Sequence, residues 1–140
     1  MKRRKPLKRS PMPARTSWMP RQSKKRKELR KQVGPLEKEF LLQFTQCAYC
    51  VEKPATCIDH IAGGAIRGAA LSHRFSWNPS CLPCNLGPAN DPTVFPVIRK
   101  LAVKLVVDGE FFDLIAFNRL RGQADDAITI AEVSAFLEWR

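Results

Sequence analysis

Two short stretches decide how this chain folds: residues 47–50 read Cys-Ala-Tyr-Cys, and residues 81–84 read Cys-Leu-Pro-Cys. A C-x-x-C turn directs two sulfur atoms towards one metal ion, and two such turns complete a closed tetrahedral site. We therefore expect a structural Zn²⁺ that joins the two stretches through Cys47, Cys50, Cys81 and Cys84. The alternatives are four ordinary buried cysteines or a redox-active pair.

The segment between these two cysteine knuckles has the pattern of a β-hairpin. Residues 55–61 (ATCIDHI) favour a strand, and the glycines within residues 62–72 indicate a flexible loop. Residues 73–80 (HRFSWNPS) complete a second strand, although Pro79 limits its pairing. Here Cys57 is interpreted as a plain strand residue.

Helices are predicted on both sides of the hairpin. Pro35 suits the first turn of a short helix that leads into the first knuckle. Apolar periodicity predicts further helices over residues 94–107 and 110–121, with Gly122 as a stop. Thr129 and Glu132 have the spacing of a capping box that opens a last helix. The predicted fold class is therefore α+β, a small zinc-bound core flanked by helices.

Positive charge is concentrated near the start of the chain. Residues 1–40 contain 15 Lys and Arg against 3 acidic residues, whereas residues 41–140 contain 9 against 10. We expect residues 1–34 to form a disordered basic arm that ends at a break at Gly34-Pro35. Residues 35–140 would form the domain, with its core at about residues 47–92 and a helical part at 93–140.

The composition excludes several classes of protein. Apolar residues make up 44% of the chain, which allows a real core, but no stretch approaches the ~18 apolar residues of a membrane span. A secretory signal is not expected either, because no apolar segment follows the charged beginning. We therefore expect a cytoplasmic protein.

A candidate reaction centre lies beside the knuckles. Asp59-His60 falls inside the predicted hairpin, and Asn85 directly follows the second knuckle. A carboxylate and an amide oxygen suit a hard divalent ion, and a neutral imidazole accepts a proton from water. Because neighbours on a strand point to opposite faces, Asp59 and His60 share a site only if the strand ends or bulges there.

These residues together resemble the HNH, or His-Me finger, endonucleases, whose ββα-metal core is stabilised by zinc. The resemblance covers residues 47–85 and implies that His60 is the general base that activates water. It also implies that Asp59 and Asn85 bind a catalytic Mg²⁺ or Mn²⁺, and that DNA is cut to 5′-phosphate and 3′-hydroxyl ends. The central Asn of the family corresponds by position to Ser76. Either Ser76 has taken over its role, orienting the loop or His60, or a displaced Asn78 has kept it, and we favour Asn78.

The flanking segments are similar to the NinG family of phage recombination nucleases, which implies branched or single-stranded DNA as substrate. The basic arm, Arg74-Phe75 and the Cys-x-x-Cys-Asn motif carry this closer resemblance. The Lys or Arg that relatives often have soon after Cys-Asn is missing from residues 86–91.

DNA is the expected partner. The candidate phosphate-binding residues are those of the loop and of the densest basic run: Arg67, Arg74, Lys24, Lys25, Arg26 and Lys27. Such contacts supply affinity without sequence choice. Two alternatives stay open: a non-catalytic zinc module that binds nucleic acid, and a zinc-stabilised protein-interaction domain, for which no salt-sensitive DNA affinity is expected.

Overall fold

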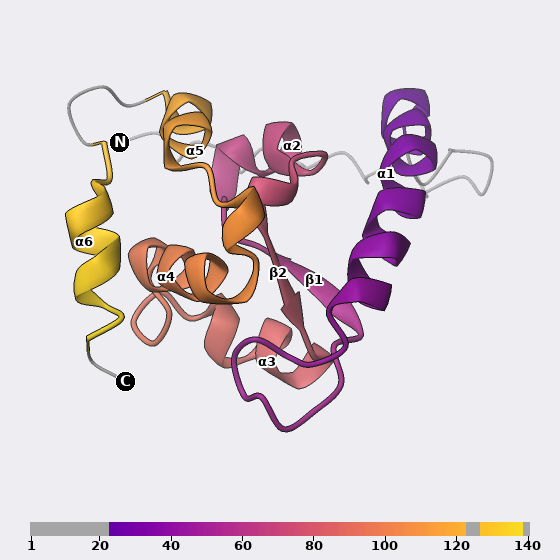
Figure 1. The fold of residues 1–140 in the computed structure, drawn as a ribbon. Coiled ribbons are helices and arrows are strands. Elements are labelled where there is room, and N and C mark those ends of the chain that lie inside the picture. The colour runs from indigo at the N-terminus through magenta and orange to yellow at the C-terminus, as the bar shows by residue number, and fades with distance from the viewer. Residues whose placement is uncertain (1–22, 123–126, 139–140) are drawn as a thin grey trace, which may run out of the picture.

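The computed structural model describes residues 23–122 and 127–138. It consists of helices around one short antiparallel hairpin (Figure 1). The elements, in which η denotes a 3₁₀-helix, are α1 (Lys24–Gln43), β1 (Cys57–His60), η1 (Gly64–Ile66), α2 (Arg67–Ala70), η2 (Arg74–Ser76), β2 (Trp77–Ser80), α3 (Leu82–Leu86), η3 (Pro88–Asn90), α4 (Val97–Val107), η4 (Gly109–Phe111), α5 (Leu114–Arg121) and α6 (Ile130–Ala135). The predicted α+β class is therefore confirmed.

The hairpin lies between α1 and α4, and its register decides which side chains face each helix (Figure 1). Asp59 pairs with Asn78, and these two side chains face α4, where both contact Lys100. His60 pairs with Trp77 on the opposite face, where the Trp77 ring packs edge-on against Phe40 of α1. The two faces therefore differ in character, because one is polar and the other aromatic.

The first helix is longer than the sequence predicted. It runs without interruption from Lys24 to Gln43, with Pro35 inside it and Ser23 as its N-cap. The predicted break at Gly34-Pro35 is wrong, and so is the disorder expected for residues 24–34. Val33 and Phe40 of α1 are buried against Trp77. The stabilisation from this packing outweighs the loss of the backbone hydrogen bond that Pro35 cannot donate. Residues 1–22 of the predicted arm lie outside the described residues.

The second half of the chain forms the larger apolar core. Leu101 and Ala102 of α4, Phe117 of α5 and Val133 of α6 pack against the loop that follows β1. Gly122 ends α5 with φ of 66°, a left-handed conformation that favours glycine. The capping box of Thr129 and Glu132 is present at the start of α6, as predicted.

Two predicted helices begin later than expected. The helix predicted over residues 94–107 begins only at Val97. Residues 91–96 form a turn instead, which is held by the Asp91 side chain as it accepts from the N–H of Thr93 at 2.9 Å. Residues 110–113 are not part of α5, which begins after its N-cap Asp113. In the part of the chain that is described, no helix is both long and apolar enough to cross a membrane.

Candidate metal centre and catalytic cleft

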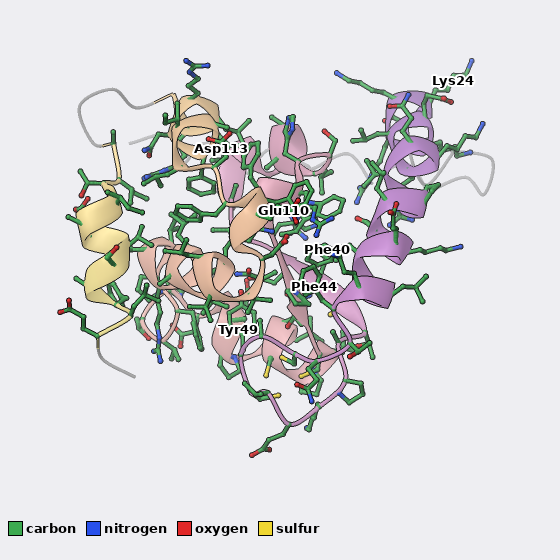
Figure 2. The ribbon with its side chains drawn as sticks, in the orientation of Figure 1. Lys24, Phe40, Phe44, Tyr49, Glu110 and Asp113 are labelled. Carbon is green, nitrogen blue, oxygen red and sulfur yellow. The ribbon has the colours of Figure 1, made fainter. Side chains whose placement is uncertain are left out.

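The four knuckle cysteines meet below the hairpin, beside α3, as the sulfur atoms in Figure 2 show. Their Sγ atoms lie within 4.8 Å of one another, and those of Cys50 and Cys81 are 3.9 Å apart. Two sulfurs of a tetrahedral zinc site with bonds of ~2.3 Å lie about 3.8 Å apart. The donor set and its spacing thus fit a structural metal such as Zn²⁺.

Local backbone geometry prepares the knuckles for a metal. The N–H of Val51 returns to the carbonyl of Cys47 at 3.0 Å, and the N–H of Asn85 returns to that of Cys81 at 3.0 Å. Burial opposes ionisation of Cys47, but hydrogen bonds from the backbone of Cys50, Cys81 and Tyr49 outweigh it and lower its pKa to about 6. Thiolate, the form that binds zinc, is therefore favoured at this position.

The three side chains expected to form the reaction centre line one cleft of about 420 Å³. Asp59 and His60 come from the end of β1, and Asn85 comes from α3. The strand ends at His60, which allows the two neighbours to border the same space. Two cations, Arg67 and Lys100, line it as well.

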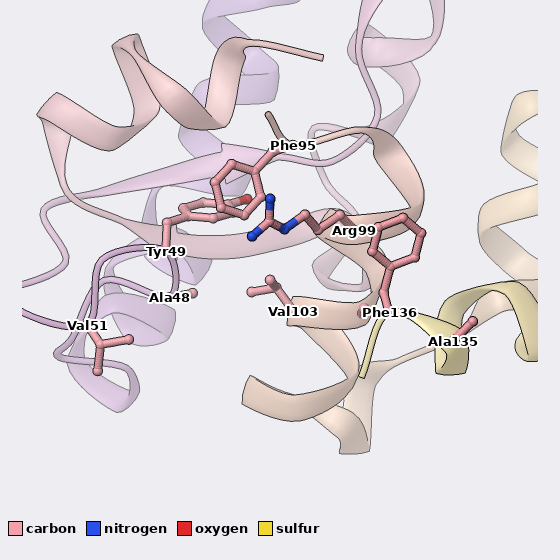
Figure 3. Close-up of a pocket in the computed structure, with 9 residues that line it drawn as sticks. Ala48, Tyr49, Val51, Phe95, Arg99, Val103, Ala135 and Phe136 are labelled. Carbon is pink, nitrogen blue, oxygen red and sulfur yellow. The ribbon is translucent and has the colours of Figure 1, made fainter. Parts of the chain in front are cut away.

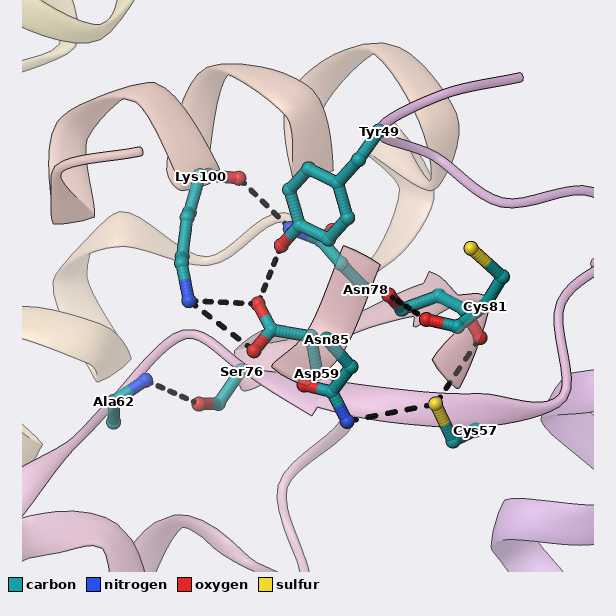
Figure 4. Close-up of polar contacts among 10 residues, drawn as sticks. Tyr49, Cys57, Asp59, Ala62, Ser76, Asn78, Cys81, Asn85 and Lys100 are labelled. Atoms are coloured by element: carbon teal, nitrogen blue, oxygen red, sulfur yellow. Dashed lines mark hydrogen bonds and ion pairs between the residues drawn. The ribbon is translucent and has the colours of Figure 1, made fainter. Parts of the chain in front are cut away.

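Asp59 is held by two partners that the sequence does not place beside it (Figure 4). The Lys100 ammonium lies 3.1 Å from Oδ1 and 2.9 Å from Oδ2. The Tyr49 hydroxyl donates to Oδ2, and it accepts in turn from the Asn78 amide at 3.2 Å. Burial, the Asp59 charge and this hydrogen bond raise the pKa of Tyr49, which therefore stays a donor.

This arrangement does not fit the Mg²⁺ expected at Asp59 and Asn85. Both carboxylate oxygens of Asp59 already contact the charge of Lys100, so a divalent ion would meet a like charge there. The amide nitrogen of Asn85 is directed to Cys57 Sγ at 3.5 Å. Asn85 is thus near the cleft, but the pair is not an open carboxylate–amide site.

His60 lies where the cleft meets a second hollow and is half-buried. Burial lowers the pKa of His60, and the nearby positive charges of Arg67 and, to a smaller extent, Lys100 lower it further. The negative charge of Asp59 acts in the opposite direction. Its Nδ1 is buried without a hydrogen-bond partner among the described residues. The neutral imidazole is therefore favoured at neutral pH, and Nε2 is the nitrogen left to face a substrate.

The role assigned to Asn78 falls to Ser76 in the structure. The Asn78 amide donates to Tyr49 and to the carbonyl of Lys100 at 3.0 Å, not to His60 or the loop after it. Ser76 holds that loop instead, because its hydroxyl accepts from the N–H of Ala62 at 3.2 Å and its carbonyl accepts from Ile61 at 2.8 Å.

Arg74 does not lie free to bind phosphate. It donates two hydrogen bonds to Asp108, at 3.0 and 3.1 Å, and one to Gln43 at 2.8 Å. Its guanidinium also lies 3.7 Å from the centre of the Phe111 ring. In this structure the Arg74 guanidinium joins α1, η2 and the end of α4, so these contacts favour a structural role over the predicted binding of DNA.

The other predicted phosphate-binding residues are exposed. Lys24, Lys25, Arg26 and Lys27 form the first turn of α1, and Lys25 and Arg26 line a groove of about 1130 Å³ between α1 and α2. Arg30 and Arg67 line the same groove, which extends to His60. Glu37 is its acidic member, and burial raises the pKa of this carboxyl while Arg30 opposes the shift.

A third hollow, of about 680 Å³, lies behind Tyr49 (Figure 3). The Tyr49 ring packs edge-on against Phe95 at 4.8 Å, and Arg99 covers the face of Phe95 at 4.3 Å. Val103 and Phe136 complete its mainly apolar wall. Phe95 separates this hollow from the cleft because it lines both.

Sequence reasoning missed Tyr49, Lys100, Lys104 and Asp108. A signal existed for the last three, because they recur every four residues along a segment, 97–108, that is otherwise apolar apart from Arg99. Lys104 is fully buried and donates to Asp108 at 2.6 Å. Burial lowers the pKa of Lys104, and Asp108 opposes that shift. Tyr49 carried no signal beyond its place inside the first knuckle.

Comparison with known proteins gives no family assignment. The chain matches no protein-family model, no curated protein and no solved structure. The site must therefore be interpreted from its own geometry.

Proposed function

We propose that this protein is a zinc-stabilised endonuclease that hydrolyses phosphodiester bonds of DNA. The observation that carries the proposal is the position of His60, a half-buried imidazole with a lowered pKa where a cationic cleft meets a basic groove. A groove lined by Lys25, Arg26 and Arg30 suits a polyanion, and it leads directly to a group able to accept a proton.

His60 acts as the general base in this proposal. Nε2 takes a proton from a water molecule while the water oxygen bonds to phosphorus, and the bond from phosphorus to the 3′ oxygen breaks. The 3′ oxygen is released as a hydroxyl by taking a proton from solvent, and His60 returns its proton to solvent, so the net change is the addition of one water. The ends formed are a 5′-phosphate and a 3′-hydroxyl.

Two side chains supply positive charge for the phosphate. Arg67 lines both the cleft and the groove, and Lys100 lines the cleft from the side of α4. Lys100 supplies the positive charge that is missing from residues 86–91, just after Asn85, although it comes from a later helix. Fixed cations around a developing negative charge stabilise the transition state.

Plasmid nicking tests the proposal. Zinc-loaded protein is incubated with supercoiled plasmid without divalent ions, with Mg²⁺ and with Mn²⁺, and His60→Ala is compared with His73→Ala. His73 is the matched control because it is the other histidine of the chain and is exposed, stacked on Phe75. We expect His60→Ala to lose nicking while it keeps zinc and DNA binding. Equal nicking by the two variants would refute the role of His60.

The substrate class follows from the same assay. The proposal extends to branched or single-stranded DNA as the preferred substrate, which is tested by competing a four-way junction and a single strand against linear duplex. Faster cleavage of the junction or the single strand is expected. Equal rates on all three would leave a general DNA endonuclease.

A second candidate function is a zinc module that binds nucleic acid without cutting it. The contact between Lys100 and Asp59 favours it, because this ion pair engages the carboxylate expected to bind the catalytic metal. Salt-sensitive DNA binding with no nicking under any of the three ion conditions would support this function and exclude the nuclease.

A further inference from the structure

We propose that the ammonium group of Lys100 is the resident cation of the cleft: it occupies the place beside Asp59 where a divalent ion would bind, and it binds a substrate phosphate directly. The proposal rests on the proposed function only for the identity of that phosphate as part of a nucleic acid.

Both oxygens of the Asp59 carboxylate are engaged by neighbouring side chains. Lys100 Nζ lies 3.1 and 2.9 Å from its two oxygens, and the Tyr49 hydroxyl donates to Oδ2. The side chains of Lys100 and Asp59 are 10% and 8% exposed, so water screens their interaction only weakly. The Lys100 carbonyl is also fixed, by the Asn78 amide at 3.0 Å, which holds this turn of α4 against β2.

A divalent ion cannot bind Asp59 while this contact lasts. Mg²⁺ requires an oxygen at ~2.0–2.1 Å and near-octahedral geometry. An ion at that distance would lie beside the Lys100 ammonium, and like charges at such separation repel strongly where water is scarce. Metal binding would therefore require Lys100 to leave Asp59.

Lys100 keeps one donor for a ligand. An ammonium group has three N–H bonds, and the two contacts with Asp59 use at most two of them. Lys100 also lines the cleft, as do His60 and Arg67. A phosphate in the cleft would meet Lys100 and Arg67 beside the imidazole, without any metal.

Manganese binding tests this exclusion. Zinc-loaded wild type, Lys100→Met, the double variant Lys100→Met/Asp59→Asn and the control Lys38→Met are titrated with Mn²⁺, and free Mn²⁺ is followed by electron paramagnetic resonance. Lys38 is the matched control because it is an exposed lysine of α1 that lines none of the three hollows. Zinc content and circular dichroism establish that each variant is folded.

We expect wild type and Lys38→Met to bind Mn²⁺ weakly, Lys100→Met to bind it at least about tenfold more tightly, and the double variant to lose that gain. Wild-type binding as tight as that of Lys100→Met, or a folded Lys100→Met with no gain, would overturn the proposal.

A measurement on the wild type covers the case in which Lys100→Met does not fold. A short labelled oligothymidylate is bound in metal-free buffer and in Mg²⁺ at matched ionic strength. Equal affinity is expected, and a requirement for Mg²⁺ would overturn the proposal. Plasmid nicking is independent of these results: its absence would refute the nuclease and leave the Mn²⁺ result unchanged.

Discussion

Arg74 and Asp108 are joined by two hydrogen bonds of 3.0 and 3.1 Å although they are 34 residues apart in sequence. Asp108 also accepts from the buried Lys104 at 2.6 Å, so two cations share one carboxylate. This group connects η2, which leads into β2, to the ends of α1 and α4, because Arg74 also contacts Gln43.

The first prediction concerns this ion pair. Arg74→Ala should lower the free energy of unfolding by about 3 kcal/mol, since it removes charged hydrogen bonds to Asp108 and the contact of the guanidinium with the Phe111 ring, although Lys104 still balances the charge of Asp108. Urea unfolding of the variant and of Arg30→Ala, an exposed arginine of α1, measures the difference. DNA affinity of folded Arg74→Ala should stay close to that of wild type. A large drop in affinity with unchanged stability would mean that Arg74 contacts the substrate.

Zinc removal gives the second prediction. A chelator strong enough to take the metal should unfold the knuckles and the hairpin, because four thiolates joined by a metal contribute to folding directly. Cys81→Ser should lower the zinc content measured by mass spectrometry, whereas Cys57→Ser should keep one zinc per chain, since Cys57 lies outside the cluster. Full zinc in both variants would contradict the site.

The backbone at Val51 leads to a third prediction. Val51 has φ of 61°, a left-handed conformation that costs a β-branched residue ~1–2 kcal/mol, and its side chain is exposed. Val51→Gly should therefore raise the free energy of unfolding by up to about 1 kcal/mol, after the greater freedom of glycine in the unfolded chain is subtracted. The thermal midpoint of zinc-loaded protein measures it, and a lower midpoint would count against this conformation.

His60 makes both stability and nicking depend on pH. Its pKa lies below the ordinary value of 6.5 because burial and the charges of Arg67 and Lys100 lower it by more than the charge of Asp59 raises it. The unfolded chain therefore binds the proton more readily, so this contribution to stability is present above pH 6.5 and is lost as pH falls through the lowered pKa. Nicking should fall in the same range, because the base must be neutral.

Arg67→Gln separates charge from burial at His60. The variant should move the acidic limb of the nicking profile to higher pH, and it should shift the His60 titration followed by NMR in the same direction. An unchanged titration would show that Arg67 does not act on the imidazole. His73→Ala simplifies the spectrum, because it removes the other histidine of the chain.

Salt dependence tests the basic groove. The triple variant Lys25→Gln/Arg26→Gln/Arg30→Gln should weaken binding to duplex DNA and reduce the slope of log affinity against log salt by about 0.9 for each phosphate that the protein no longer neutralises. Lys38→Gln, outside the groove, should leave the slope nearly unchanged. Equal slopes in the two variants would place the DNA elsewhere on the surface.

Features set by local sequence were predicted correctly. The knuckle spacing, the glycine that ends α5 and the capping box of α6 each depend on residues within one turn of one another. The hairpin was also predicted, from the strand character of residues 55–61 and 73–80, although its strands are shorter, Cys57–His60 and Trp77–Ser80, and short helical turns occupy residues 64–70 and 74–76. Such features need no knowledge of a distant partner.

The remaining features depend on distant partners, and sequence reasoning missed them for that reason. Pro35 ends a helix in isolation, but the packing of Val33 and Phe40 on Trp77 carries α1 through it. Arg74 has the sequence pattern of a phosphate-binding residue until Asp108 is placed beside it. The same holds for Asp59, whose availability to a metal depends on a lysine 41 residues away.

The spacing of charges along α4 has one last consequence. Lys100, Lys104 and Asp108 follow one another at intervals of a single helical turn, and each meets a fixed counter-charge. If α4 slid by one turn so that Lys104 took the place of Lys100 beside Asp59, Lys100 would lose its carboxylate and Asp108 would leave Arg74. These ion pairs therefore favour one docking position of α4 on the hairpin over positions shifted by a helical turn. An interface made only of apolar side chains would distinguish these positions less.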